Sequence, residues 1–198
     1  MQDKILEKST DLFLKFGYKS VTMDDIAAEL SISKKTVYKY FKTKLDLVKA
    51  SISQLHKNCE AIITEIANDK KGAIEESYEI KDRFDDLFSD IKMSPIYQLK
   101  KFYPEVYTEI LEKDQDCHDE HFKVNLEKGI RDGDFRQDID INFVTKVYFR
   151  LLYWIHSHPD IQQMAQNETK LLEYHLRAIV TPTGLVKLEK QLSKYEES

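Results

Sequence analysis

Residues 21–49 read VTMDDIAAELSISKKTVYKYFKTKLDLVK, a pattern typical of two short helices joined by a tight turn. Thr22 is a favourable helix N-cap, and Asp25 stands three residues later, at the spacing of a capping box with Asp in place of Glu. A helix is therefore predicted to begin near Met23. Its apolar stripe consists of Ile26, Ala27 and Leu30.

A second short helix is predicted after a tight turn, with Ser33 as its cap. Val37 and Phe41 lie four residues apart and therefore share one helix face, which we expect to point inward. The outer side is left with lysines and hydroxyl groups, namely Lys34, Lys35, Thr36, Tyr38, Lys39 and Lys42. Because such a surface suits phosphate oxygens and base edges, the helix pair is typical of a chain that presents one helix to a DNA groove.

This N-terminal segment resembles the tetracycline-repressor (TetR) family of bacterial regulators. The resembled pattern covers residues 5–48 and contains, in order, Phe16-Gly17-Tyr18, Val21-Thr22, Ile26-Ala27, Ser33-Lys34-Lys35-Thr36-Val37-Tyr38, Tyr40-Phe41, Lys44, Leu45 and Leu47. So long a string with fixed spacing is far more specific than a bare helix-turn-helix pattern. The resemblance implies that the second helix of the pair is a recognition helix in the major groove.

The resemblance further implies that Tyr38 and Lys44 contact backbone phosphates. The complete set of expected DNA contacts is Thr22, Lys34, Lys35, Thr36, Tyr38, Lys39, Tyr40 and Lys44. One position departs from the family pattern, because the turn between the two helices commonly carries glycine and here carries Ser31. If Ser31 adopts a left-handed conformation, serine costs about 1 kcal/mol relative to glycine.

Composition favours an all-α fold. The chain has 198 residues, of which five are Gly and four are Pro, and these numbers leave little room for sheet turns or flexible linkers. With the resemblance, we expect a three-helix helix-turn-helix DNA-binding domain over residues 1–48. A helical bundle for effector binding and dimerisation is expected over residues 49–198.

The charge is unevenly distributed along the chain. Residues 1–49 contain ten Lys and seven Asp or Glu, a net charge of +3, so the total of −5 leaves −8 for residues 50–198. A positive end on an acidic remainder orients the molecule toward DNA. A fluctuation of surface charge is the simpler explanation, and the motif carries more weight than the charge does.

The expected location is the cytoplasm. No run of 18 apolar residues occurs, and the first helix is charged and amphipathic, unlike the core of a signal peptide. Cys59 and Cys117 are too few and too far apart in the chain to indicate a disulfide framework. No cofactor is expected, because the chain lacks a P-loop and a Rossmann glycine fingerprint.

Helical spacing predicts further helices along the rest of the chain. They are expected over residues 44–68, 73–92, 105–132 and 142–156, and from about residue 167, with Gly72 near the end of the first and a short element starting at Ser94-Pro95. The segment 129–136 is a glycine-punctuated turn, and Pro182 and Gly184 interrupt the last helix.

Residues 143–155 form the most apolar helix of the chain. Their apolar side chains reach around most of the helix circumference, so packing on a single core does not account for them, and a second buried surface is implied. In the resembled family the last two major helices pair with their copies in a second subunit. By that resemblance, Asn142–His156 and Glu168–Val180 are the expected dimerisation helices of a homodimer.

Aromatic side chains are concentrated on the helices that surround the effector pocket in the resembled family. The residues expected to line it are Phe84, Phe88, Tyr103, Tyr107, His121, Tyr148 and Trp154. They favour an apolar or aromatic ligand over a phosphorylated one, because this part of the chain lacks a Gly-rich phosphate loop and has only five Arg. The alternative, that each aromatic side chain simply fills a core, stays open.

One cluster has the spacing of metal ligands. In the sequence Cys117-His118-Asp119-Glu120-His121, a helix would place Cys117 and His121 on one face, four residues apart. A metal-responsive regulator is therefore an alternative, but a polar stretch of a solvated helix is the simpler interpretation, since no second ligand cluster has recognisable spacing. We assign no metal site.

Two other classes of protein compete with a regulator. An enzyme is disfavoured because the chain lacks the G-x-S-x-G, P-loop, Rossmann and H-E-x-x-H motifs. A helical scaffold protein would explain the chain after residue 50 but not residues 21–44. The resemblance implies a ligand-responsive repressor that binds a palindromic operator as a dimer, with the effector shifting the long connecting helix.

Overall fold

The computed structural model describes residues 1–196, and the side chains of residues 1–110 and 120–194. Within these residues the regular structure is helical, apart from one isolated bridge between Phe135 and Val180. The helices are α1 (Gln2–Phe16), α2 (Met23–Glu29), α3 (Lys34–Tyr40), α4 (Lys44–Ala67), α5 (Ala73–Leu87), α6 (Pro95–Phe102), α7 (Pro104–Arg131), α8 (Ile141–His156), α9 (Ile161–Ile179) and α10 (Pro182–Glu196). The predicted all-α class is confirmed.

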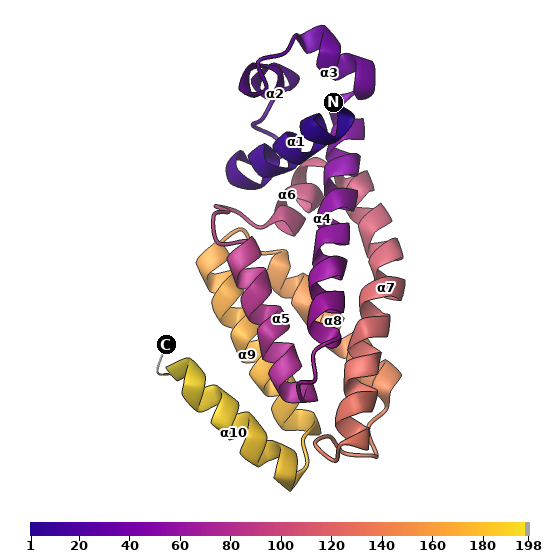
Figure 1. Ribbon diagram of the computed structural model, residues 1–198, viewed down its shortest axis with the longest axis vertical. Coiled ribbons are helices and arrows are strands. Elements are labelled where there is room, and N and C mark those ends of the chain that lie inside the picture. The colour runs from indigo at the N-terminus through magenta and orange to yellow at the C-terminus, as the bar shows by residue number, and fades with distance from the viewer. Residues whose placement is uncertain (197–198) are drawn as a thin grey trace.

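The molecule is elongated, with a small head at one end (Figure 1). The head consists of α1, α2 and α3, and the body consists of α5 to α10. The helix α4 starts in the head and runs into the body beside α7 (Figure 1). The last helix, α10, packs on α5 and α9 at the end farthest from the head. In the described residues no helix is both long and apolar enough to cross a membrane.

Capping side chains set where the head helices begin, as predicted. The Thr22 hydroxyl accepts from the Asp25 N–H at 3.2 Å, and the Asp25 carboxylate accepts from the Thr22 N–H at 2.8 Å, which completes the capping box. Ser33 caps α3 by accepting from the Thr36 N–H at 3.1 Å. Ser31, in the turn between the two helices, has φ 53, the left-handed conformation that its place in the turn implied.

The apolar core of the head is completed by residues of the body. Val37 and Phe41 point inward as expected, with exposed fractions of 0% and 6%. Leu99 of α6 and Val106 of α7 belong to the same core and are equally buried. Burying such side chains is the main force that holds the head, so the head does not end cleanly at residue 48.

Three boundaries in the body differ from the prediction. The helix α5 ends at Leu87 instead of continuing to residue 92, because the chain turns at Phe88 and buries Ile91. Gly72 precedes α5 as its N-cap and does not end α4, which stops at Asn68. The helix α9 begins at Ile161, about two turns earlier than expected, because the Asp160 carboxylate accepts from two N–H groups of its first turn.

The glycine-punctuated turn after α7 depends on one close approach. The Phe135 ring lies so near Gly129 that a Cβ there would come within 2.1 Å of it. Only glycine fits this position without a shift of the ring, and the turn then lets Phe135 bridge to Val180. Pro182 does not merely interrupt the preceding helix, because it begins the separate helix α10.

Candidate DNA-binding surface and effector cavity

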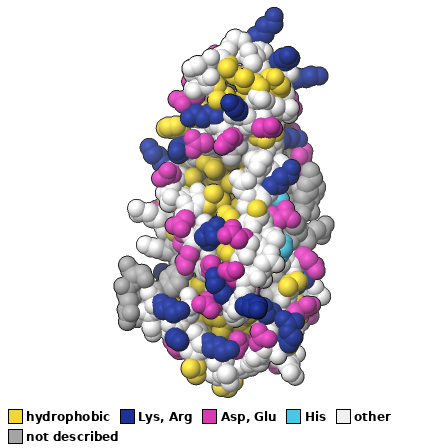
Figure 2. All heavy atoms as spheres, in the orientation of Figure 1, with side chains coloured by type: hydrophobic (Ala, Val, Ile, Leu, Met, Phe, Trp, Pro, Cys, Tyr) yellow, Lys and Arg dark blue, Asp and Glu magenta, His cyan; other side chains and the backbone are white. Residues whose placement is uncertain are grey.

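The helix α3 presents its basic side to solvent at the tip of the head. The side chains of Lys34, Lys35, Tyr38 and Lys39 are exposed, whereas Thr36 is half-buried. In Figure 2 lysines project from this end of the molecule, in the orientation of Figure 1. The backbone of α3 is held by the Ser33 cap and by Val37 in the core, so a rigid helix carries the exposed groups.

Several of these groups already have partners within the head. The Lys34 ammonium forms an ion pair with the Asp24 carboxylate at 2.8 Å, and its hydrogen bond to Asp24 raises the pKa of Lys34. Both side chains are largely exposed, so the pair contributes little to stability and can open to a competing anion. The Thr36 hydroxyl lies 2.8 Å from that of Ser33.

Lys44 lies at the first turn of α4 and is less exposed than the lysines of α3. Its ammonium donates to the Lys19 carbonyl at 2.9 Å and lies 6.0 Å from the centre of the Phe13 ring. Burial lowers the pKa of Lys44, and nearby Asp25 opposes that effect. The structure therefore holds this ammonium in one place beside the head. Tyr40 is half-buried against the head core, while Thr22 is exposed as the cap of α2.

A glutamine of α6 ties the head to the body. The Gln98 side-chain oxygen accepts from the Tyr18 N–H at 2.9 Å, and its amide nitrogen donates to the Met93 carbonyl at 3.2 Å. Gln98 is 4% exposed. Gly17, the C-cap of α1, has φ 93, and a Cβ there would lie 2.6 Å from the same Gln98 oxygen. The Tyr103 hydroxyl adds a bond to the Tyr18 carbonyl at 3.3 Å.

The other end of α6 is bound to α8. The Ser94 hydroxyl donates to the His156 carbonyl at 2.5 Å and also accepts from the Tyr97 N–H at 3.2 Å as the cap of α6. Ser94 is completely buried. Because α6 contacts α1 through Gln98 and α8 through Ser94, it connects the head directly to the end of α8.

The body encloses a cavity of about 630 Å³ lined by residues from α4 to α9. Its walls are largely apolar and include Ile52, Cys59, Ile63, Ile80, Val106 and Leu152. Of the residues expected to line an effector pocket, Phe84, Phe88, His121 and Tyr148 lie in this wall. The volume is in the range of small-molecule sites.

The structure does not bring the other three expected residues to the cavity. Tyr103 and Tyr107 pack against the core of the head. Trp154 is 72% exposed on the outer side of α8. Because α8 is apolar around most of its circumference, its periodicity alone does not reveal which side faces the cavity.

An aromatic layer includes the cavity-wall residues Phe122 and Tyr148. The Phe122 and Tyr148 rings stack with their centres 4.8 Å apart, and the His175 ring lies 4.8 Å from that of Tyr148 and 5.2 Å from that of Phe122. His175 is 8% exposed, and its Nε2 has no hydrogen-bond partner among the described residues. Burial lowers the pKa of His175 to about 4 and raises the pKa of Tyr148. A lone histidine on an apolar helix face has no sequence pattern that would predict its position in this aromatic layer.

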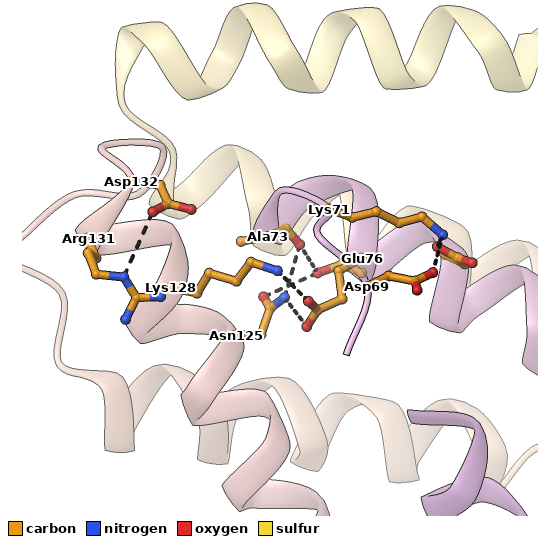
Figure 3. A network of polar contacts seen from close by, with 10 residues as sticks. Asp69, Lys71, Ala73, Glu76, Asn125, Lys128, Arg131 and Asp132 are labelled. Atoms are coloured by element: carbon orange, nitrogen blue, oxygen red, sulfur yellow. Dashed lines mark hydrogen bonds and ion pairs between the residues drawn. The ribbon is translucent and has the colours of Figure 1, made fainter. Parts of the chain in front are cut away.

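The acidic side chains of the cavity wall are held by neighbouring groups. Glu76 of α5 accepts from the Asn125 amide at 2.7 Å and from the Lys128 ammonium at 2.7 Å (Figure 3). The Asn125 amide also donates to the Ala73 carbonyl at 3.1 Å. This network joins the start of α5 to the end of α7. Glu168 of α9 forms an ion pair with His156 of α8.

The possible metal cluster falls mostly outside the described side chains. Cys117, His118 and Asp119 lie in the stretch for which only the backbone is described. In the remainder of the described chain, no group of three His, Cys, Asp or Glu is arranged to hold a metal ion.

The first similarity to known proteins concerns the sequence of the head. Residues 5–51 match the family of bacterial regulatory proteins named for tetR. A helix-turn-helix-type transcriptional regulator of Bacillus subtilis, YhgD, is 26% identical over 176 residues, which are 80% of this chain and 86% of the relative. The chain belongs to the TetR family.

Further similarities cover most of this TetR chain. The negative regulator IcaR of the biofilm operon icaADBC of Staphylococcus aureus is 25% identical over 66% of this chain and 73% of its own length. A transcriptional regulator of Cytophaga hutchinsonii has the same fold, with a TM-score of 0.74, 18% identity, and 90% of this chain and 98% of that chain covered. A gamma-butyrolactone receptor aligns with a TM-score of 0.68 and 19% identity over 98% and 96% of the two chains.

The family assignment decides between the competing classes. This TetR protein is a DNA-binding transcriptional regulator and not an enzyme. Neither a scaffold protein nor a metal-responsive regulator is favoured by the comparisons.

The buried His175 predicts a pH dependence of stability. Its pKa falls from 6.5 to about 4 on folding, so between these pH values the unfolded chain binds the proton and the folded chain does not. The free energy of unfolding should therefore fall as pH decreases from 6.5 to about 4, by up to about 3 kcal/mol from this residue. Urea denaturation across this pH range measures the effect.

His175→Phe keeps an aromatic ring in the layer and removes the ionisable group, so its pH dependence should be shallower than that of the wild type. The matched control is His158→Phe, at an exposed position. An identical pH dependence in the wild type and His175→Phe would contradict the assignment of a neutral buried imidazole.

Proposed function

We propose that this TetR protein is a ligand-responsive repressor that binds a palindromic operator as a homodimer in the cytoplasm. The observation that carries the proposal is the exposed basic face of α3, joined through α4 and α6 to an internal cavity of effector size. Two similarities support it. The relative IcaR is a negative regulator, and a gamma-butyrolactone receptor shares the fold.

We assign DNA binding to residues 1–48, and effector binding and dimerisation to residues 49–198. In the head, Tyr38 and Lys44 are proposed to contact phosphates, since both lie beside the tip and Lys44 is held in place by the Lys19 carbonyl. Lys35, Thr36 and Lys39 are proposed to reach base edges. The remaining proposed contacts are Thr22, Lys34 and Tyr40.

Phosphate contacts and base contacts predict different mutant behaviour. Tyr38→Phe and Lys44→Ala should weaken binding by a similar factor on all DNA sequences, because phosphates carry no sequence information. Lys44→Ala should also reduce the slope of log affinity against log salt by about 1. Substitutions at Lys35 should instead change sequence preference. Fluorescence anisotropy with operator and scrambled duplexes at several salt concentrations measures both quantities.

Lys190→Ala, at an exposed lysine of α10 far from the head, is the control for loss of one positive charge. If Tyr38→Phe and Lys44→Ala both bind DNA as tightly as this control, α3 does not dock as proposed.

The exposed apolar side of α8 is the proposed dimer interface, together with α9. Phe143 and Trp154 are 66% and 72% exposed, and Val147 is 40% exposed between them. Tyr174 of α9 is 68% exposed. Large apolar side chains grouped on one surface mark an interaction site, and a twofold axis brings the same surface of two subunits together.

A charge at this surface should separate the subunits without unfolding them. Trp154→Glu places a carboxylate at a position that is 72% exposed in the single chain. The substitution should therefore lower the stability of the dimer and leave the fold of the subunit unchanged. Sedimentation velocity at micromolar concentration should show a dimer for the wild type and a monomer for the variant. An interface of standard size buries roughly 1,200 to 2,000 Å².

Val186→Glu is the matched control, because Val186 is 71% exposed on α10, a helix that is not part of the proposed interface. Leu176 is unsuitable as a test, since it is 1% exposed in the body core and a charge there would unfold the subunit. A monomeric wild type, or a dimeric Trp154→Glu, would refute the interface.

The effector is proposed to act by changing the distance between the two recognition helices. Half-sites of a palindromic operator lie about 34 to 36 Å apart, or at multiples of this distance, so a small rotation of each head prevents simultaneous docking. A coupling free energy of about 1 to 3 kcal/mol is sufficient. The cavity reaches the head through α4, which lines it, and through α6, whose Gln98 holds the end of α1.

The Gln98 bond predicts that the orientation of the head depends on α6. Gln98→Met keeps the length of the side chain but leaves the buried Tyr18 N–H without its acceptor. Hydrogen exchange of the Tyr18 amide should become faster, and operator affinity should fall about tenfold as the head loses its fixed orientation. Amide exchange by NMR and DNA anisotropy measure the two effects.

Gln54→Met is the control, because the Gln54 amide makes only an exposed bond to Asn58 on the same helix. Wild-type exchange and wild-type affinity in Gln98→Met would exclude α6 as a route to the head.

A further inference from the structure

The charged side chains of the cavity wall lie in pairs. Within the described part of the chain, every Lys, Asp and Glu that lines the cavity lies close to an oppositely charged side chain or, for Glu168, to the His156 imidazole. The pairs are Lys49–Glu109 at 2.6 Å, Lys128–Glu76 at 2.7 Å, Lys81–Asp85 and His156–Glu168.

The two deeper pairs are the best protected from water. The Glu76 and Glu168 side chains are 6% and 12% exposed, and Glu76 also accepts from the Asn125 amide (Figure 3). A charged ligand would either break one of these pairs or remain without a counter-ion inside an apolar wall, and both arrangements are unfavourable. The cavity therefore disfavours anions and cations alike.

One neutral polar group on the wall is well placed to bind a ligand. The Tyr148 hydroxyl makes no hydrogen bond to any group of the described residues, although its ring is fixed by stacking on Phe122 and by contact with His175. Burial raises the pKa of Tyr148, so at neutral pH the phenol keeps its proton and can donate it in a hydrogen bond. A donor on the cavity wall without a partner in the protein gains most from an acceptor on the ligand.

We propose that the effector is an uncharged, largely apolar molecule that carries a carbonyl-type acceptor for the Tyr148 hydroxyl. This inference rests on the proposed function, because it takes the cavity to be the effector site. It restricts the effector to uncharged molecules that carry a hydrogen-bond acceptor within reach of the Tyr148 hydroxyl.

Three dyes of different charge test the inference on the full-length protein. Prodan is an uncharged aromatic ketone, 8-anilinonaphthalene-1-sulfonate is an anion, and rhodamine 6G is a cation. Prodan should bind saturably and at least about tenfold more tightly than either charged dye. Leu152→Trp, which inserts a larger side chain into the cavity wall, should abolish prodan binding and so locate the dye.

The Tyr148 hydroxyl is tested by Tyr148→Phe, which removes one oxygen and keeps the stacked ring. Prodan emission moves to the red when its carbonyl accepts a hydrogen bond, so the dye bound to the variant should emit further to the blue. Its affinity should fall about fivefold to tenfold. Tyr97→Phe is the matched control, because Tyr97 lies outside the cavity wall.

Several results would overturn the inference. They are tighter or equal binding of a charged dye, no binding of any dye, and unchanged prodan emission and affinity in Tyr148→Phe. Operator binding by the dye-free protein is measured separately by gel mobility shift. If the dye-free protein does not bind the operator, the proposed function as a repressor is refuted. The dye measurements would still show whether the cavity prefers uncharged or charged ligands.

Discussion

Leu99 takes part in two apolar surfaces, and the arrangement of head and body depends on it. It lies in the core of the head and in the wall of the cavity, and it is 1% exposed. A fully buried leucine contributes about 1.5 to 3 kcal/mol. The helix α6 has only eight residues. It contacts both the head core and the cavity wall because it lies between them. The head is thus placed by packing as well as by the continuous helix α4, and Leu99 and the Gln98–Tyr18 bond form a continuous path of contacts from the cavity wall to the end of α1.

The head could be predicted almost completely from the sequence, because local contacts determine it. A capping bond joins residues two or three positions apart, so Thr22 with Asp25, and Ser33 with Thr36, are legible without knowledge of the rest of the chain. The same chemistry starts α9 at Asp160, about two turns before the start that apolar spacing predicts. There the first two turns bury Met164 among mostly polar residues, so the apolar period became clear only later in the helix.

The cavity could be predicted only in outline, because contacts distant in sequence form it. The apolar residues of α8 include Tyr148 in the cavity wall, Ile155 in a buried cluster and Trp154 on the outside. Because α8 carries apolar side chains toward the cavity, the buried cluster and the outside, its sequence has no polar stripe that would indicate which side faces solvent. The Gln98–Tyr18 bond spans 80 residues and has no signature in the local sequence. For the same reason, Tyr103 was expected in the cavity wall and instead completes the junction with the head.

Lysine side chains are exposed on α3 and paired with carboxylates in the cavity wall. The difference follows from their access to water. On α3, Lys35 and Lys39 remain exposed, where water stabilises their charges. In the cavity wall the Lys128 side chain is 19% exposed and is matched by Glu76, since an unpaired charge would be costly there. The net charges of +3 for residues 1–49 and −8 for residues 50–198 count the exposed and the paired charges together. Long-range attraction favours the approach of the head to DNA, whereas the cost of losing water disfavours an unpaired charge inside the body.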